Sequence, residues 1–126
     1  MKKIILLIVL IISGLNVFAQ SKELGDKYRK QGDYEKAAEA YRKCMEKDED
    51  CLYGLIMMLD FKEIKPTPQY TEHLYRLILP LAKNGDIIAQ HSLGILFNFG
   101  FGVTENFRKA FFWYKKSAEQ IGRAHV

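Results

Sequence analysis

The sequence has few of the residues that build metal centres, and it has no marked excess of either charge. It contains two cysteines and three histidines among 126 residues. Neither His73 nor His91 has a cysteine or a carboxylate at ligand spacing, so we expect no metal site and no cofactor. Nineteen Lys and Arg stand against fifteen Asp and Glu. No stretch is rich enough in Lys and Arg to indicate binding of nucleic acid.

The sequence also lacks the patterns of phosphate and acyl-transfer chemistry. Gly100-Phe101-Gly102 follows a helical pattern and has no lysine after it, so it is not a phosphate-binding loop. No pairing of a nucleophile with a histidine base can be argued from the chain. We therefore name no catalytic residue and expect that the protein is not an enzyme.

Residues 1–19 have the parts of a secretory signal peptide. Lys2 and Lys3 form a positive start, residues 4–12 are an unbroken apolar run, and Val17-Phe18-Ala19 suits a cleavage site. A membrane anchor is the alternative, but the run is short for a bilayer span. We predict a secreted or periplasmic protein with no stable membrane insertion. Without Lys2 and Lys3, seventeen basic residues face fifteen acidic ones, which lowers the net charge from +4 to about +2.

Residues 20–120 carry helical periodicity in six segments. Apolar residues recur at spacings of three and four, and Gly- or Pro-containing breaks such as Gln31-Gly32-Asp33 and Asn84-Gly85-Asp86 separate the segments. Pro80 should kink the fourth segment or end its regular part. We predict three antiparallel helix pairs: 21–30 with 33–47, 50–64 with 69–83, and 86–99 with 106–120.

The spacing of matching positions indicates an array of repeats. Gly25 and Leu59 are 34 residues apart, and Leu59 and Gly94 are 35 apart, which is the period of helix-pair repeats. One helix hairpin cannot bury both faces of its helices and needs stacked neighbours. The predicted fold is all-α, a right-handed α-solenoid of antiparallel helix pairs with about three repeats.

Two segments resemble known repeat families. The segment 21–47 resembles the tetratricopeptide repeat through Leu24-Gly25, Tyr28, Gly32-Asp33-Tyr34, Ala37 and Tyr41. The segment 85–120 resembles the longer Sel-like (Sel1-type) repeat through Ala89, Leu93-Gly94, Phe97, Gly100, Gly102-Val103, Lys109-Ala110, Trp113-Tyr114, Lys116 and Ala118-Glu119. The resemblance implies a helix-pair solenoid that binds other proteins or holds complexes together, and it implies no chemistry.

The resemblance also implies where a partner would bind. In tetratricopeptide arrays the first helix of each pair lines a concave groove, whose mixed basic and aromatic residues here suit a peptide segment. The same residues are also what a solvated helix face carries, and that interpretation stays open. Carried over by position, the candidate peptide-binding groove consists of Lys22, Asp26, Arg29, Lys30, Tyr53, Ile56, Asp60, His91, Asn98 and Phe99.

The leading functional hypothesis is a non-catalytic protein–protein interaction module, a scaffold or adaptor, in the periplasm or outside the cell. Its partner would be a protein or a peptide. Two alternatives remain open at this point. The chain is the docking arm of a larger enzyme or sensor, or it is a domain that binds envelope glycans through exposed aromatic side chains.

Cys44 and Cys51 leave two interpretations. Secretion would allow a disulfide between them. However, Cys44 is expected about a turn before the end of one helix and Cys51 at the start of the next, which would place their Cα atoms beyond bridging range. A buried apolar thiol at Cys44 is the interpretation that we favour.

The end of the chain departs from the repeat pattern. Ile121 stands where the Sel-like pattern has glycine, and residues 121–126 can be read from a sequencing-adapter sequence. We predict that 121–126 is a non-native tail and that further repeats follow in the native protein.

Phe111 to Tyr114 are four consecutive aromatic residues, which sweep about one full helical turn. At least one should be exposed, as part of an apolar patch that a following repeat would cover.

Overall fold

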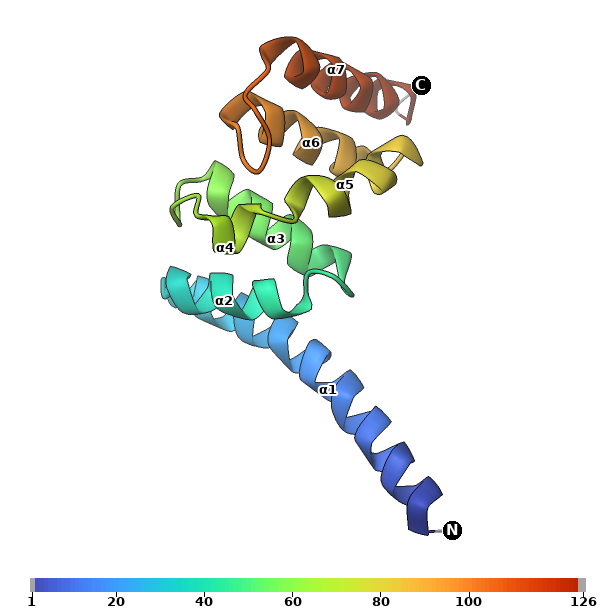
Figure 1. Cartoon of the computed structure of the whole chain (residues 1–126). Helices are drawn as coiled ribbons and strands as arrows, with labels where there is room; N and C mark the ends of the chain where they lie inside the picture. Colours follow the sequence, from blue (N-terminus) through green and yellow to red (C-terminus); the bar gives the residue numbers. More distant parts are fainter. Residues whose placement is uncertain (1, 125–126) are drawn as a thin grey trace. The chain divides into compact units, whose positions relative to one another are not determined.

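The structure, a computed structural model, describes residues 2–124, apart from the side chains of residues 7, 9–19 and 124. These residues form helices and turns with no strand among them, which confirms the predicted all-α, helix-repeat class (Figure 1). The chain divides into two compact units, Met1–Gly54 and Leu55–Val126. The helices are α1 (Lys2–Lys30), α2 (Tyr34–Cys44), α3 (Glu49–Asp60), α4 (Pro68–Thr71), α5 (Leu74–Lys83), α6 (Ile87–Phe99) and α7 (Phe107–Ala124).

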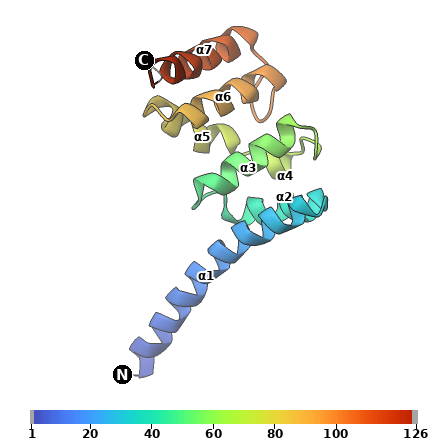
Figure 2. The ribbon, with the colours of Figure 1, turned by 180° about the vertical axis from the view of Figure 1, so that it is seen from behind.

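The first unit is built on the pairing of α1 with α2. Figure 2 shows α2 lying along the C-terminal part of α1. Ala37 and Ala38 are fully buried in α2, and their small side chains let the two helices approach closely. The Tyr41 ring lies against two glycines. A methyl group at Gly25 would come within 2.5 Å of Tyr41 Cε1, and one at Gly54 would come within 3.2 Å of Tyr41 Cε2.

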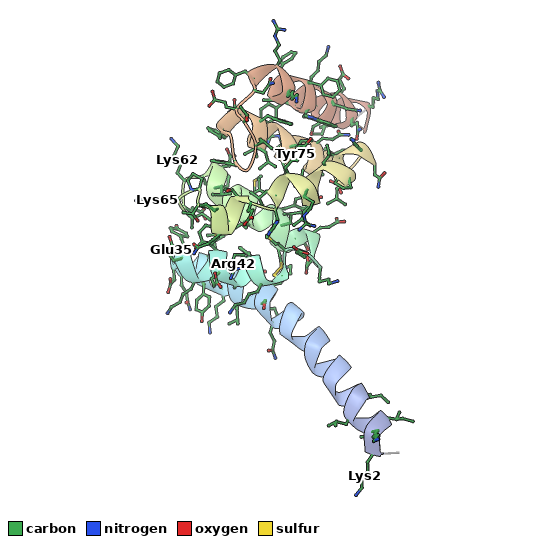
Figure 3. All side chains as sticks on the ribbon, viewed as in Figure 1. Lys2, Glu35, Arg42, Lys62, Lys65 and Tyr75 are labelled. Atoms are coloured by element: carbon green, nitrogen blue, oxygen red, sulfur yellow. A yellow bond between two sulfur atoms is a disulfide. The ribbon has the colours of Figure 1, made fainter. Side chains whose placement is uncertain are left out.

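The two cysteines form a disulfide, so our preference for a free thiol at Cys44 was wrong. The Cα atoms of Cys44 and Cys51 are 5.8 Å apart, within the ordinary range for a bridge (yellow in Figure 3). The prediction failed because α2 was expected to continue to residue 47, whereas it ends at Cys44. The turn that follows brings the chain back, and both cysteine side chains are fully buried.

The second unit contains the pairing of α6 with α7, and α5 packs on α6. The most buried side chains of α5 and α6 are aliphatic, among them Leu74, Ile78, Leu93 and Leu96. Polar bonds fix the helix register. Gln90 Nε2 donates to the carbonyl of Ala82 at 3.1 Å, and Ser117 Oγ donates to the carbonyl of Ile87 at 3.1 Å.

The turn signals around α6 act as the sequence predicted. Gly85 has φ +95°, and the Asp86 side chain accepts a bond from the Ala89 amide at 2.8 Å, so this pair ends α5 and caps α6. Gly100 ends α6 with φ +71°, and Gly102 adopts φ +72° in the following turn. Both positions need glycine because side chains rarely adopt that region.

The fourth predicted helix, over residues 69–83, is divided into two helices, and the division does not lie at Pro80. Helix α5 runs through Pro80 to Lys83, and the Asn84 amide donates to the Pro80 carbonyl at 3.0 Å. The break lies instead between α4 and α5, just after Thr71, whose carbonyl lies against Gly102. The helical spacing of the apolar residues did not predict this break.

Three other helix boundaries differ from the prediction. Helix α3 ends at Asp60 and not at residue 64, because Lys62 adopts φ +58° and the Glu63 amide bonds back to the Met58 carbonyl. Helix α1 begins at Lys2 and continues through the predicted signal segment, which has no proline to stop it. Helix α7 extends to Ala124, so residues 121–124 of the predicted tail are helical, and residues 125–126 lie outside the described residues.

Candidate functional site

Asp26 is the centre of a hydrogen-bond network on the first unit. Lys22 Nζ lies 3.1 Å from Asp26 Oδ2, and the Tyr41 hydroxyl of α2 donates to Asp26 Oδ1 at 2.6 Å. Burial alone would raise the pKa of Asp26, but hydrogen bonds from Tyr41 and Lys22 and the charges of Lys22 and Lys30 outweigh it and lower that pKa. Burial, followed by the bond to Asp26, raises the pKa of Tyr41, which therefore stays a donor.

The remaining candidate residues of the first unit differ in exposure. Lys30 is exposed at the end of α1, and Arg29 is half-buried beside it. Tyr53, in contrast, is buried, with 9% of its surface exposed. The accessible part of the candidate groove on this unit is therefore basic, with Asp26 already engaged by its two partners.

On the second unit, Ile56 does not belong to a surface. It is fully buried, as its helical spacing with Leu52 and Leu59 predicted, so its inclusion in the groove was wrong. A buried aliphatic side chain at that position packs the core and cannot contact a peptide.

Asp60 and His91 each interact with Tyr114, a residue that the predicted groove did not include. The ring of the exposed His91 lies 5.2 Å from the ring of Tyr114. Burial, followed by the negative charge of Asp60, raises the pKa of Tyr114. From the sequence, Tyr114 belongs to the Sel-like signature and to the aromatic run of residues 111–114, but not to the predicted groove. Its position one helical turn after Ala110, a buried residue of α7, was the signal that it faces α6.

Asn98 and Phe99 lie at the end of α6. Asn98 is half-buried, and Phe99 has 43% of its surface exposed. The Phe99 ring stacks on the Phe101 ring at 5.3 Å, with 19° between their planes. Phe101 is buried, so Phe99 is the ring of this stack that is accessible to solvent.

The aromatic run of α7 is divided between core and solvent, as predicted. Phe111 and Phe112 have 67% and 55% of their surfaces exposed, whereas Trp113 and Tyr114 are half-buried. Lys116 Nζ lies 5.6 Å from the Phe112 ring centre and 5.5 Å from that of Trp113. These distances suit cation–π interactions.

The described residues offer no group of three or more His, Cys, Asp or Glu side chains that could hold a metal ion. Within residues 2–124, no helix combines the length and the apolar character needed to cross a membrane. The arrangement that is present consists of polar and aromatic side chains on helix faces, which suits contact with another molecule.

Comparison with known proteins gives two family matches. Residues 22–51 match the tetratricopeptide repeat, and residues 87–121 match the Sel1 repeat. The chain is 32% identical over 73 residues to a sel1-like repeat-containing protein of Acanthamoeba polyphaga mimivirus, a match that covers 56% of this chain and 14% of that relative. No solved structure matches the chain. The matches, which fall on the α1–α2 and α6–α7 pairs, support a repeat protein of the tetratricopeptide and Sel1 type.

Proposed function

We propose that the chain is a non-catalytic scaffold or adaptor module that binds a protein or peptide partner in the periplasm or outside the cell. The observation that carries this proposal is the pair of repeat matches on two separate helix pairs. Modules of these families typically bind other proteins, and helix-pair repeats offer extended surfaces for doing so.

The peptide contact on the first unit would be made by the exposed end of α1. Lys22 and Asp26 hold each other in place at 3.1 Å, and Arg29 and Lys30 extend the basic surface towards the end of the helix. Because Asp26 is already paired, the cations favour a partner with carboxylates. On the second unit, the exposed ring of His91 and the Phe99–Phe101 stack would take apolar or aromatic side chains of a partner.

Two observations support the proposed location. Residues 1–19 have the composition of a signal peptide. The Cys44–Cys51 bridge suits an oxidising compartment, because thiols in the cytosol are kept reduced. Each observation comes from a different part of the chain, and both favour export.

Site-specific photocrosslinking in the native compartment would test the binding proposal. A photoreactive residue at Lys30 or at His91 should give discrete adducts with a partner protein. The same residue at Lys43, exposed on α2, is the matched control and should give none. Adducts that form equally well from Lys43, or from no position, would contradict binding through the candidate groove.

Export can be tested separately. N-terminal sequencing of the protein recovered from the periplasm or the medium should give a chain that begins at Gln20. A chain that keeps its first residues, stays in the cytosol and has reduced cysteines would contradict the proposed location.

A further inference from the structure

The outer face of α7 is an exposed surface that the candidate groove does not include. The inner side of the helix is occupied, because Ala110 and Ser117 are buried against the rest of the unit. The rest of its surface exposes Phe107, Phe111 and Phe112, with 65%, 67% and 55% of their surfaces accessible. Three large exposed aromatic side chains on one helix are more than a solvated helix needs.

The same face is strongly basic. Helix α7 carries a single acidic residue, Glu119, whose carboxylate lies 3.9 Å from Lys115 Nζ. Lys116 is positioned over the rings of Phe112 and Trp113. The helix has five basic residues. Lys109 lies over the Phe97 ring of α6 at 5.3 Å, which leaves Arg108, Lys115, Lys116 and Arg123 for the outer face. A partner that covers this face must therefore supply negative charge as well as apolar surface.

The order of side chains around α7 decides which kind of partner fits. At about 100° per residue, Phe107 and Phe111 fall on one line along the helix and Phe112 on another. Arg108 and Lys115 fall between these two lines. A flat lipid surface would have to bury these two cations in order to bury all three rings, whereas membrane-binding helices keep their cations on the opposite, polar side. A partner helix with carboxylates between its apolar residues can place apolar side chains against both lines of phenylalanines. At the same time its carboxylates can pair with the two cations.

Building on the function proposed above, we infer that the outer face of α7 binds an acidic amphipathic helix of a partner protein. A second copy of this chain is disfavoured as the partner, because within residues 2–124 it offers no exposed helix that is both acidic and apolar. Among the described helices only α3 is net negative, and its apolar side chains are buried except for Met57. The partner helix carries apolar residues at spacings of three and four, flanked by Asp or Glu that pair with Arg108 and Lys115.

A displayed library of helical peptides, varied in charge and in apolar pattern and selected on the full chain, tests this inference. The selected peptides should be acidic, with apolar residues on one face. Their affinity, measured by fluorescence anisotropy, should fall at least tenfold for Phe111→Ala with Phe112→Ala. It should fall similarly for Arg108→Glu with Lys115→Glu, and added salt should weaken the binding to the unchanged chain.

The matched control is Lys43→Glu with Lys47→Glu, two exposed residues outside the candidate groove, which should leave the affinity within about twofold because neither lies on α7. Circular dichroism checks that each variant stays folded. Peptides whose affinity falls for Lys30→Glu and not for the α7 pairs would overturn this inference and keep the proposed function. Failure to select any peptide would overturn this inference, and the crosslinking experiment would then decide the proposed function.

Other occupants give distinct results. Selected peptides without net charge would indicate a face made for stacking on another helix pair and would overturn the inference. Sedimentation with phosphatidylglycerol vesicles that is lost in the phenylalanine variant, without acidic peptides, would assign the face to a membrane instead. A dimer of the unchanged chain that the phenylalanine variant abolishes would assign it to a second copy.

Discussion

The Tyr114 ring occupies the space where a side chain of residue 94 would lie. A methyl group at Gly94 would come within 2.5 Å of Tyr114 Cδ1 and Cε1. We expect Gly94→Ala to lower the free energy of unfolding by roughly 1–3 kcal/mol, because the ring must move in a packed core. Urea unfolding followed by circular dichroism measures this change.

Gly122 provides the matched control for that substitution. It lies in α7 like Tyr114, and nothing stands within 4 Å of a methyl group at its position. Gly122→Ala should leave the stability unchanged or raise it by about 0.5–1 kcal/mol, since alanine favours the helix. Equal effects of the two substitutions would show that contact with Tyr114 is not what requires glycine at position 94.

Loss of the disulfide should destabilise the chain. The bridge joins residues with a sequence separation of 7, and closing so short a loop is worth about 2.5 kcal/mol through the unfolded state. Replacing both cysteines by alanine, or adding a reductant, should lower the urea midpoint accordingly. The reductant should have no effect on the doubly substituted chain, and an unchanged midpoint for the reduced native chain would contradict the role of the bridge.

The Asp26 network predicts a dependence of stability on pH. The pKa of Asp26 is lowered in the folded chain, so its contribution is present above the unfolded value of about 3.9 and is lost as the pH falls through the folded pKa. Asp26→Asn should therefore destabilise the protein at neutral pH, and the difference from the native chain should shrink in acid. Unfolding midpoints at several pH values measure this difference.

Two further variants distinguish the effect of the Asp26 hydrogen-bond network from a general effect of removing a charge. Tyr41→Phe should raise the Asp26 pKa towards its ordinary value, which a carboxyl-carbon titration by NMR would detect. Asp33→Asn removes only an exposed ion pair with Lys36, at 3.4 Å, and should change stability little. If Tyr41→Phe leaves the pKa of Asp26 unchanged, the hydrogen bond from Tyr41 is not what lowers that pKa, and this prediction is wrong.

The exposed phenylalanines of α7 should be detectable by a hydrophobic dye. Phe111 and Phe112 leave an apolar patch on the surface, and the folded chain should therefore increase the fluorescence of such a dye. Phe111→Ser with Phe112→Ser should remove most of the signal. Tyr34→Ser, at an isolated exposed aromatic in α2, is the comparison and should remove little of it.

The helix pairs could be predicted because short-range sequence signals specify each repeat. Glycines with positive φ and an aspartate cap sit at helix ends, and helical spacing marks the buried faces, as at Leu93 and Leu96. These signals depend on the backbone and on neighbours three or four residues away. They failed at the break between α4 and α5, where the Thr71 carbonyl lies close to Gly102 of a distant segment.

The candidate groove was less predictable for a related reason. Position in a repeat indicates which helix faces a groove, but not which side chains are already used by the core. Ile56 and Tyr53 are buried, and Asp26 is engaged by Tyr41. The disulfide was missed because an error of three residues in the end of α2 changes the separation of Cys44 and Cys51 by about a helical turn.

The Cys44–Cys51 bridge also closes the chain into a ring around the turn at residues 45–50, where Glu46 and Lys47 are exposed. A protease that cuts after Lys47 would therefore release no fragment, since the two sulfur atoms still join α2 to α3. The nicked molecule would keep both halves at a local concentration that lets them stay paired, and it would separate only when reduced. An accessible turn that a protease can cut is in this way kept from dividing the protein.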